Sequence, residues 1–426
     1  MTESKSGPPS PDPPLPVHRQ LRSSAQGRSR LTTWLLRIAL QAGEGRSGLE
    51  PASEAAAIDL PSDDGIVVAD LPALAEGHGL ACLVAPRLSR ILAEPERRAL
   101  HDAAARCRAR DARLHRDQTA LDAAIAARGL THLWLKGAWL VGACYPPPAC
   151  RPRADLDLLV PAGDLPAMAD LLHTLGYRPT SQTWKHQVWL RPDNRSVVDL
   201  RGEHPDNPRP VELHGRLVEA FRGISLVLDA DAALARGADA LAGPCRALGM
   251  VHLCAHLTVD MLSRRARGMQ LVDLARLAPR LDAEDWKRVC ELGGGRHSAR
   301  FVWPALALAA RHAPAALPAG VLDELAGALR PELRAWLETV DLDALSRFGR
   351  KDRRRALLEV PSIWPIDGSE RRRVWRAILW PGRWELADRY PSLSASRLWR
   401  LAQLRHLGFS ARTLARRWRL RPGRST

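Results

Sequence analysis

Between residues 131 and 222 the sequence changes from long helical periodicity to short apolar runs separated by Gly, Pro and Asp. This change constrains the fold more than any other feature. Short apolar runs bounded by turn residues are typical of strands, and five are found, at 131–137, 155–160, 186–190, 196–200 and 210–214. Segment 165–175 has amphipathic helical spacing and ends before Gly176, where a C-cap glycine belongs. The pattern predicts a small α/β unit.

Helical spacing dominates on both sides of this unit. Apolar residues three and four apart predict a helical region over 31–130 and a helical bundle over 223–345. Residues 1–30 contain six prolines between Pro8 and Pro16 and little core material, so we expect them to be disordered. The expected fold class is therefore α+β.

The basic character of the chain lies in its last segment. The net charge is +16. Residues 346–426 contain 21 Lys+Arg against 6 Asp+Glu, which leaves 42 against 41 for the rest. Arginine clusters alternate there with six tryptophans. Three interpretations stay open: a nucleic-acid surface, an anionic membrane surface, or a solvated helical face packed on the rest of the protein.

Cysteine usage and hydropathy bound the class of protein. The seven cysteines are odd in number and form no CxxC pair, which argues against a disulfide framework and a structural zinc site. The first apolar run, 31–40, is interrupted by Arg37 and is too short to cross a bilayer. We expect no signal peptide, no transmembrane helix and a cytoplasmic location.

Asp155 and Asp157 are the strongest candidates for chemistry. Lying two apart on an expected strand, they project from one face while Leu156 and Leu158 project from the other. Two carboxylates on one face can share hard metal ions such as Mg²⁺ or Mn²⁺, as phosphoryl and nucleotidyl transfer requires. The tripeptide alone is more often a polar strand edge, so its setting has to support the prediction.

The expected strand at 131–137 ends in Lys136 and Gly137, about twenty residues before the aspartates. Glycine permits close approach of backbone to phosphate, and helix N-terminal amides favour anions. Lys136, one of only five lysines, adds a point charge suited to a triphosphate. An ordinary exposed turn is the alternative.

A third carboxylate on a neighbouring strand would complete a two-metal site. Glu212 is the first candidate, and Asp199 is a rival because its expected strand is equally apolar. Either acid would be costly to bury among apolar residues without a partner. The sequence leaves both open.

Other polar pairs are better explained structurally. His252 and His256 lie four apart on an expected helix, but Leu253 follows His252, so the HExxH pattern is absent. We interpret them as packing or hydrogen-bonding histidines, and Asp273 and Arg276 as a helix-surface pair. The chain contains no GxxxxGK[ST], no GxGxxG and no kinase HRD or DFG motif.

Several of these segments together resemble the uncharacterised nucleotidyltransferase family of the polymerase-beta-type superfamily. The resemblance rests on the segments 135–138, 151–160, 175–177 and 211–214, continues through 251–257 and 271–274, and covers roughly 95 to 315. It implies a minimal nucleotidyltransferase core with a mixed sheet over 131–222. Many superfamily members carry Gly-Ser at the phosphate turn, where this chain has Gly137 and Ala138.

The resemblance also implies residue roles. Asp155 and Asp157 would be metal ligands with Glu212 as the third acid, and Lys136, Gly137 and Arg153 would lie near the nucleotide phosphates. The expected function is metal-dependent transfer of a nucleoside monophosphate from an NTP such as ATP to an unknown acceptor. The alternative is a non-catalytic protein of this fold that engages RNA or an anionic membrane surface through residues 346–426.

Overall fold

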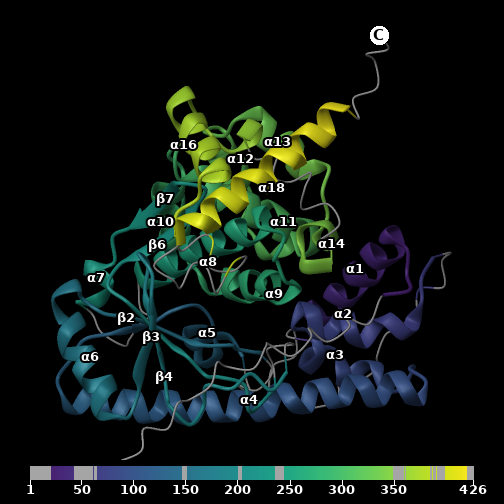
Figure 1. The fold of residues 1–426 in the computed structure, drawn as a ribbon. Helices are drawn as coiled ribbons and strands as arrows, with labels where there is room; N and C mark the ends of the chain where they lie inside the picture. The colour runs from purple at the N-terminus through teal and green to yellow at the C-terminus, as the bar shows by residue number, and fades with distance from the viewer. Residues whose placement is uncertain are drawn as a thin grey trace, which may run out of the picture.

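The computed structural model describes residues 21–42, 61, 65–145, 151–199, 204–235, 244–348, 359, 361–383, 386, 390 and 399–419. The proline-rich segment 8–16 and the arginine cluster at 353–355 lie outside the described residues. Within them the fold is α+β, as expected: a mixed five-stranded sheet, a two-stranded sheet and many helices. Figure 1 shows the sheet on one side, the long helix α4 beneath it and the helical bundle above.

In the described part of the chain before the sheet there are four α-helices: α1 (Ala25–Gln41), α2 (Leu71–His78), α3 (Ala81–Leu88) and α4 (Glu94–Ala127). The prediction of disorder up to residue 30 is wrong at its end. Ser24 caps α1 by accepting a hydrogen bond from the Gly27 amide, and Leu31 and Leu35 are fully buried. Capping and burial together stabilise the helix from Ala25 onward.

The five-stranded sheet consists of β1 (Leu133–Trp134), β2 (Leu156–Leu159), β3 (Arg178–Gln182), β4 (Gln187–Leu190) and β5 (Val211–His214). Its order is β1-β2-β5-β4-β3, and β2 and β5 pair in parallel whereas the other pairs are antiparallel. Two helices accompany it, α5 (Lys136–Cys144) and α6 (Leu165–Thr174).

One face of the sheet forms a small core of its own. Leu156 and Leu158 of β2 join Val211 and Leu213 of β5 in a buried cluster with side chains of α4 and α6. Because strand side chains alternate between faces, the residues between these leucines point to the opposite side, toward the helical bundle. The aspartates lie on that opposite face.

The strand expected at 196–200 is absent from residues 196–199, and Leu200 lies outside the described residues. Val197 and Val198 are exposed. The Asn207 side chain accepts hydrogen bonds from the Val198 and Asp199 amides. This side-chain pairing replaces a strand ladder. Two features were not predicted, β3 and the hairpin of β6 (Leu217–Phe221) with β7 (Ile224–Leu228).

Eight helices are described between the hairpin and residue 345: α7 (Asp231–Leu234), α8 (Pro244–Leu262), α9 (Gly268–Leu277), α10 (Ala283–Gly293), α11 (Ala299–His312), α12 (Val321–Ala326), α13 (Pro331–Glu338) and α14 (Leu342–Leu345). Short 3₁₀ turns occur at 68–70, 162–164, 278–280 and 314–316. The helix α8 is central, since it packs on α10, α11 and β6. Its inner surface joins one large apolar core with α1–α3.

The described part of the basic segment forms α16 (Gly368–Leu379) and α18 (Trp399–Arg419), which lie on top of the bundle in Figure 1. Val374 and Ile378 are buried, whereas the arginines 371–373 are exposed. A buried ion pair between Arg300 and Glu370, 2.6 Å from Nη1 to Oε2, ties α16 to α11. None of the described helices is long and apolar enough to cross a membrane.

Candidate active site

Two adjacent parallel strands bring the predicted acids together. Asp157 of β2 is the register partner of Glu212 of β5, and Leu159 is the partner of His214. Register partners in a sheet share a face, so the side chains of Asp157, Glu212 and His214 all project toward the bundle. Asp155 precedes β2 by one residue and lies on the same face by alternation.

Lys136 contacts Asp157 directly. Its Nζ lies 2.7 Å from Oδ1 of Asp157, and both side chains are largely buried. The residue starts α5 with φ of +47°, a left-handed conformation that costs a non-glycine residue about 1–3 kcal/mol. Such strain persists where the surrounding structure fixes a residue. Here the strained backbone conformation accompanies the contact of the ammonium group with Asp157.

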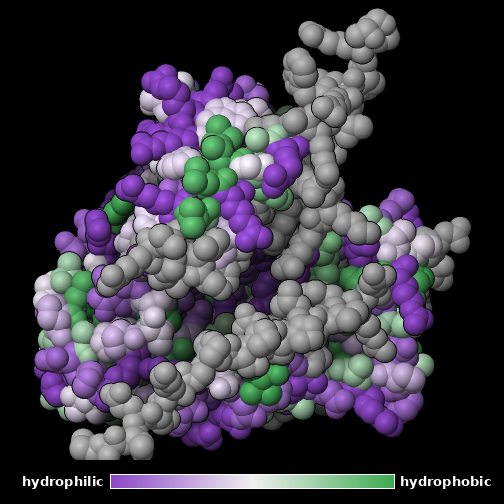
Figure 2. All heavy atoms as spheres, viewed as in Figure 1, coloured by the Kyte–Doolittle hydropathy of each residue, from purple (hydrophilic) through white to green (hydrophobic). Residues whose placement is uncertain are grey.

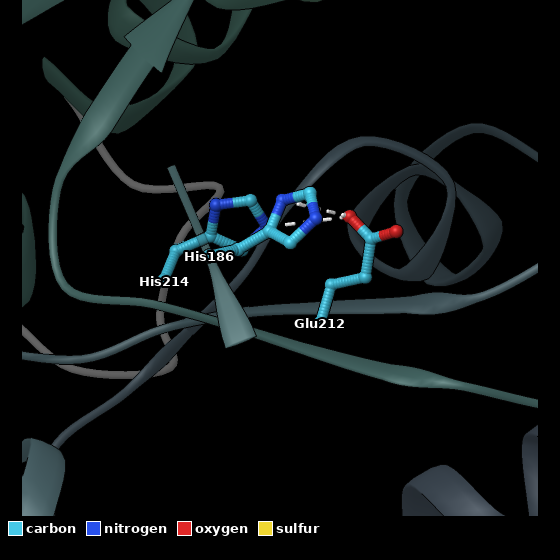
Figure 3. Close-up of side chains that lie close together, drawn as sticks. All are labelled: His186, Glu212 and His214. Carbon is cyan, nitrogen blue, oxygen red and sulfur yellow. Dashed lines mark ion pairs between the residues drawn. The ribbon is translucent and has the colours of Figure 1, made fainter. Parts of the chain in front are cut away.

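Two histidines lie beside the acids, and Figure 3 shows the rings of His186 and His214 together on one side of the Glu212 carboxylate. Nε2 of His214 lies 3.1 Å from Oδ1 of Asp157 and 3.7 Å from Oε2 of Glu212. His186, from the turn before β4, places Nδ1 3.3 Å from Oε2 of Glu212. The two imidazole rings meet edge to face at 5.0 Å between centroids. Among the described residues these three side chains are the one group of three or more His, Cys, Asp or Glu whose ligand atoms lie within 4.8 Å of one another.

The charges and the burial of the cluster shift the pKa values of two of its carboxylates in opposite directions. Burial acts to raise the pKa of Asp157, but Lys136 and His214 outweigh burial and hold it well below its ordinary value. Burial, then the charges of Asp157 and Glu212, raise the pKa of Asp155 to about 7. Asp155 is therefore the acid whose ionised form is disfavoured by burial and by the neighbouring carboxylates.

This electrostatic imbalance fits a divalent cation. The oxygens of Asp155, Asp157 and Glu212 are the hard donors that Mg²⁺ and Mn²⁺ prefer. Burial first, and then repulsion from Asp157 and Glu212 that Lys136 does not cancel, raise the pKa of Asp155, and a cation among the three oxygens would offset both. The donor set present therefore fits the metal implied by the sequence.

The pH dependence of stability should reveal Asp155. With a pKa of about 7 against 3.8 in the unfolded chain, the folded protein binds this proton more tightly, so deprotonation destabilises it as pH rises from about 4 to 7. Asp155→Asn should therefore raise the melting temperature of metal-free protein, little at pH 5 and most above pH 7. Melting curves in chelator from pH 5 to 8 measure this difference; a difference independent of pH would contradict it.

A second polar cluster adjoins the first. Glu219 of β6 is buried and accepts from Nζ of Lys185 at 2.9 Å, and its Oε1 lies 3.3 Å from His252 Nε2 and 3.1 Å from His256 Nδ1. The interpretation of both histidines as hydrogen-bonding residues is confirmed. His252 also lines a small pocket with Lys136. Sequence reasoning missed Glu219 and Lys185, although Lys185 is one of the five lysines.

Asp199 lies outside the strands that carry these acids. Its backbone amide and carbonyl are bonded to the Asn207 side chain, in a loop outside the sheet. Of the two rivals for the third acid, only Glu212 is a strand partner of Asp157. The geometry thus favours Glu212.

The arginines near the site are engaged by protein groups. Arg153 Nε lies 2.7 Å from Asp111 Oδ1, and its Nη1 donates to Gln118 at 2.7 Å, both on α4. A phosphate would have to displace these partners. Gly137 makes room for Arg151, because a Cβ there would lie 2.2 Å from Arg151 Nη1.

The prediction of a surface pair between Asp273 and Arg276 is wrong. Asp273 is 1% exposed and accepts from Arg151 Nε at 2.8 Å, from Arg151 Nη2 at 2.6 Å and from the Tyr145 hydroxyl at 2.6 Å. Arg276 lies instead over the Tyr145 ring. Spacing on one helix did not reveal a partner from a distant segment.

Carboxylates converging from adjacent parallel strands beside a buried lysine are the arrangement of a nucleotidyl-transfer protein with an α+β fold. The chain belongs to the family described as uncharacterised nucleotidyltransferase, which matches residues 66–314. This match confirms the resemblance and spans the sheet, the site and most of the bundle. No significant match was found among curated proteins or solved structures.

Proposed function

We propose that the protein transfers a nucleoside monophosphate from an NTP to a small or macromolecular acceptor, with Asp155, Asp157 and Glu212 as ligands of Mg²⁺ or Mn²⁺. The observation that carries this proposal is the parallel register of Asp157 with Glu212, with Asp155 two residues earlier. Family membership supports nucleotidyl transfer in general. The acidic geometry supports the metal and the NTP donor.

In the proposed reaction the acceptor oxygen or nitrogen forms a bond to the α-phosphorus of the NTP. The bond from that phosphorus to the bridging oxygen breaks, pyrophosphate leaves with the electron pair, and the acceptor proton passes to a carboxylate of the site. A divalent cation held by the three acids would neutralise phosphate charge during this step. The residues Lys136 and His214 fix the carboxylate of Asp157 in place before substrate arrives.

The function is tested by incubating the protein with radiolabelled NTPs, candidate acceptors and either Mg²⁺ or Mn²⁺. The wild type should release labelled pyrophosphate or label an acceptor only when metal is present, whereas Asp157→Ala should do neither. Absence of metal-nucleotide binding by the wild type would overturn the proposal. Melting curves of both proteins separate loss of chemistry from loss of fold.

A second candidate function comes from α18. The exposed side chains Leu401, Leu404 and Leu407 recur every third residue on one side of the helix, with exposed arginines at 400, 405 and 412. Figure 2 shows hydrophobic side chains beside hydrophilic ones over this part of the molecule. Leucines flanked by arginines suit the interface of an anionic bilayer better than a phosphate backbone. We propose that α18 rests on such a surface.

Leu404→Asp should weaken binding to anionic phospholipid vesicles roughly tenfold, since burial of a leucine side chain contributes about 1.5–3 kcal/mol. Val227→Asp is the matched control, because Val227 is a similarly exposed apolar side chain on β7. Vesicle sedimentation measures both variants against neutral vesicles. Binding to oligonucleotides that ignores Leu404→Asp, without vesicle binding, would assign the basic segment to nucleic acid instead.

A further inference from the structure

We propose that His186, Glu212 and His214 form a mixed nitrogen and oxygen ligand set that selects a first-row transition-metal ion, of the Mn²⁺ to Zn²⁺ class, over Mg²⁺. The inference deepens the proposed function, because Glu212 belongs to both sets. It stands on the placement of the two histidines and concerns metal choice, which can be measured without nucleotide or acceptor.

The donor atoms are already close to a coordination geometry. A tetrahedral ion with bonds of about 2.0–2.1 Å needs ligand atoms about 3.3 Å apart. Oε2 of Glu212 is 3.3 Å from Nδ1 of His186 and 3.7 Å from Nε2 of His214. All three atoms lie within 4.8 Å of one another. Small side-chain rotations would therefore bring the set to bonding distance, with no movement of β4 or β5.

The described contacts of the His186 ring, an ion pair with Glu212 and an edge-to-face contact with His214, leave its Nδ1 without a hydrogen bond. Its Nδ1 is a buried atom that makes no hydrogen bond, although Glu212 Oε2 is only 3.3 Å away. The ring therefore faces the carboxylate at ion-pair distance without the angle of a hydrogen bond. The nitrogen of one imidazole thus lies beside a carboxylate oxygen and near a second imidazole. This is the arrangement of ligands around a metal ion.

The backbone holds the set in place. Glu212 and His214 are two apart on β5, so both project from the same face of the sheet. His186 immediately precedes the neighbouring antiparallel strand β4, whose Val188 is the register partner of Glu212. Oδ1 of Asp157 lies 3.1 Å from Nε2 of His214, so a metal ion bound to that nitrogen would replace the hydrogen bond between them and have the Asp157 carboxylate beside it as a further oxygen donor.

Ligand chemistry sets the choice of metal. Carboxylates alone suit Mg²⁺, whereas two neutral imidazoles with one carboxylate are the donors of zinc and related sites. Mg²⁺ keeps its waters and binds imidazole poorly. A nucleotidyl-transfer site whose metal ligands are aspartates alone does not require an imidazole. The presence of His186 beside Glu212 therefore distinguishes this site from a carboxylate-only Mg²⁺ site.

The test titrates chelator-treated full-length protein with Co²⁺, the spectroscopic substitute for Zn²⁺, and then adds competing Zn²⁺, Mn²⁺ or Mg²⁺. The wild type should bind Co²⁺ with the visible absorption band of a tetrahedral nitrogen and oxygen site. Zn²⁺ and Mn²⁺ should displace it at far lower concentrations than Mg²⁺. His186→Ala and His214→Asn should each weaken Co²⁺ binding at least tenfold.

Two variants guard against misinterpretation. His186→Asp restores an oxygen donor, so it should recover Mn²⁺ binding while losing the visible Co²⁺ band. His256→Asn is the matched control, since His256 also lies beside a buried carboxylate, that of Glu219, but outside the ligand set; it should bind Co²⁺ as the wild type does. His186 is partly exposed, so its substitution should fold even where that of buried His214 does not.

Absence of a visible Co²⁺ band in the wild type, or unchanged Co²⁺ affinity in folded His186→Ala, would overturn the inference. Either result leaves nucleotidyl transfer with Mg²⁺ untouched. Conversely, tight Co²⁺ binding without any NTP turnover would uphold the metal set and count only against the proposed reaction. The two proposals therefore fail separately.

Discussion

Glu212→Gln is expected to lower nucleotidyl transfer at least about a hundredfold, and Asp199→Asn to leave it within about twofold of the wild type. The sequence offered both acids as the third ligand. In the structure Glu212 is the register partner of Asp157 on the adjacent parallel strand, whereas the backbone of Asp199 is bonded to Asn207 in a loop. The strand register therefore places Glu212 beside Asp157, and we assign the third ligand to it.

These two variants control for one another, because each removes one carboxylate charge and keeps the shape of the side chain. Steady-state rates at saturating NTP and metal, with melting curves for both proteins, make the comparison. Loss of activity in Asp199→Asn together with full activity in Glu212→Gln would reverse the assignment. Equal, mild losses in both would show that neither acid is a ligand.

Asp273→Ala is expected to lower the free energy of unfolding by about 3–5 kcal/mol, the largest stability effect that we predict. The substitution leaves the buried guanidinium of Arg151 without the carboxylate that holds it through two nitrogens. It also removes the acceptor of the Tyr145 hydroxyl. Since Arg151 lies four residues before Asp155, the loss should loosen the approach to β2 as well as the contact with α9.

Chemical denaturation measures the change, with Glu94→Ala as a control whose exposed ion pairs on α4 should leave stability unaltered. The double variant Arg151→Met with Asp273→Leu should recover much of the loss, because it removes both buried charges together. A mild effect of Asp273→Ala would contradict the view that this pair anchors the sheet to the bundle.

The strand-borne acids were predictable from sequence because alternation along a strand is a local property. Asp155 and Asp157 alternate with Leu156 and Leu158, and this alternation predicts that the two aspartates share one face of β2. Glu212 and His214 have the same spacing, which places His214 on the face of Glu212 and could have identified it as a site residue. His186 gave no such signal, since only the pairing of β4 with β5 brings it to Glu212.

The unpredicted features depend on unusual turns or on distant partners. Hairpin β6–β7 turns through Arg222 and Gly223, both with positive φ, and arginine at the first of these positions hides the usual Asn-Gly signature. Asp273 finds Arg151 from 122 residues away, which helix spacing does not encode. At 196–199, Asn207 supplies the hydrogen bonds that a neighbouring strand would have given.

The most direct test of the central claim is equilibrium binding of a non-hydrolysable NTP to the wild type, Glu212→Gln and Asp199→Asn, with and without divalent metal. If Asp155, Asp157 and Glu212 hold the metal-nucleotide complex, the wild type and Asp199→Asn bind only with metal, and Glu212→Gln binds at least tenfold more weakly. Metal-independent binding, or equal binding by all three proteins, would contradict it.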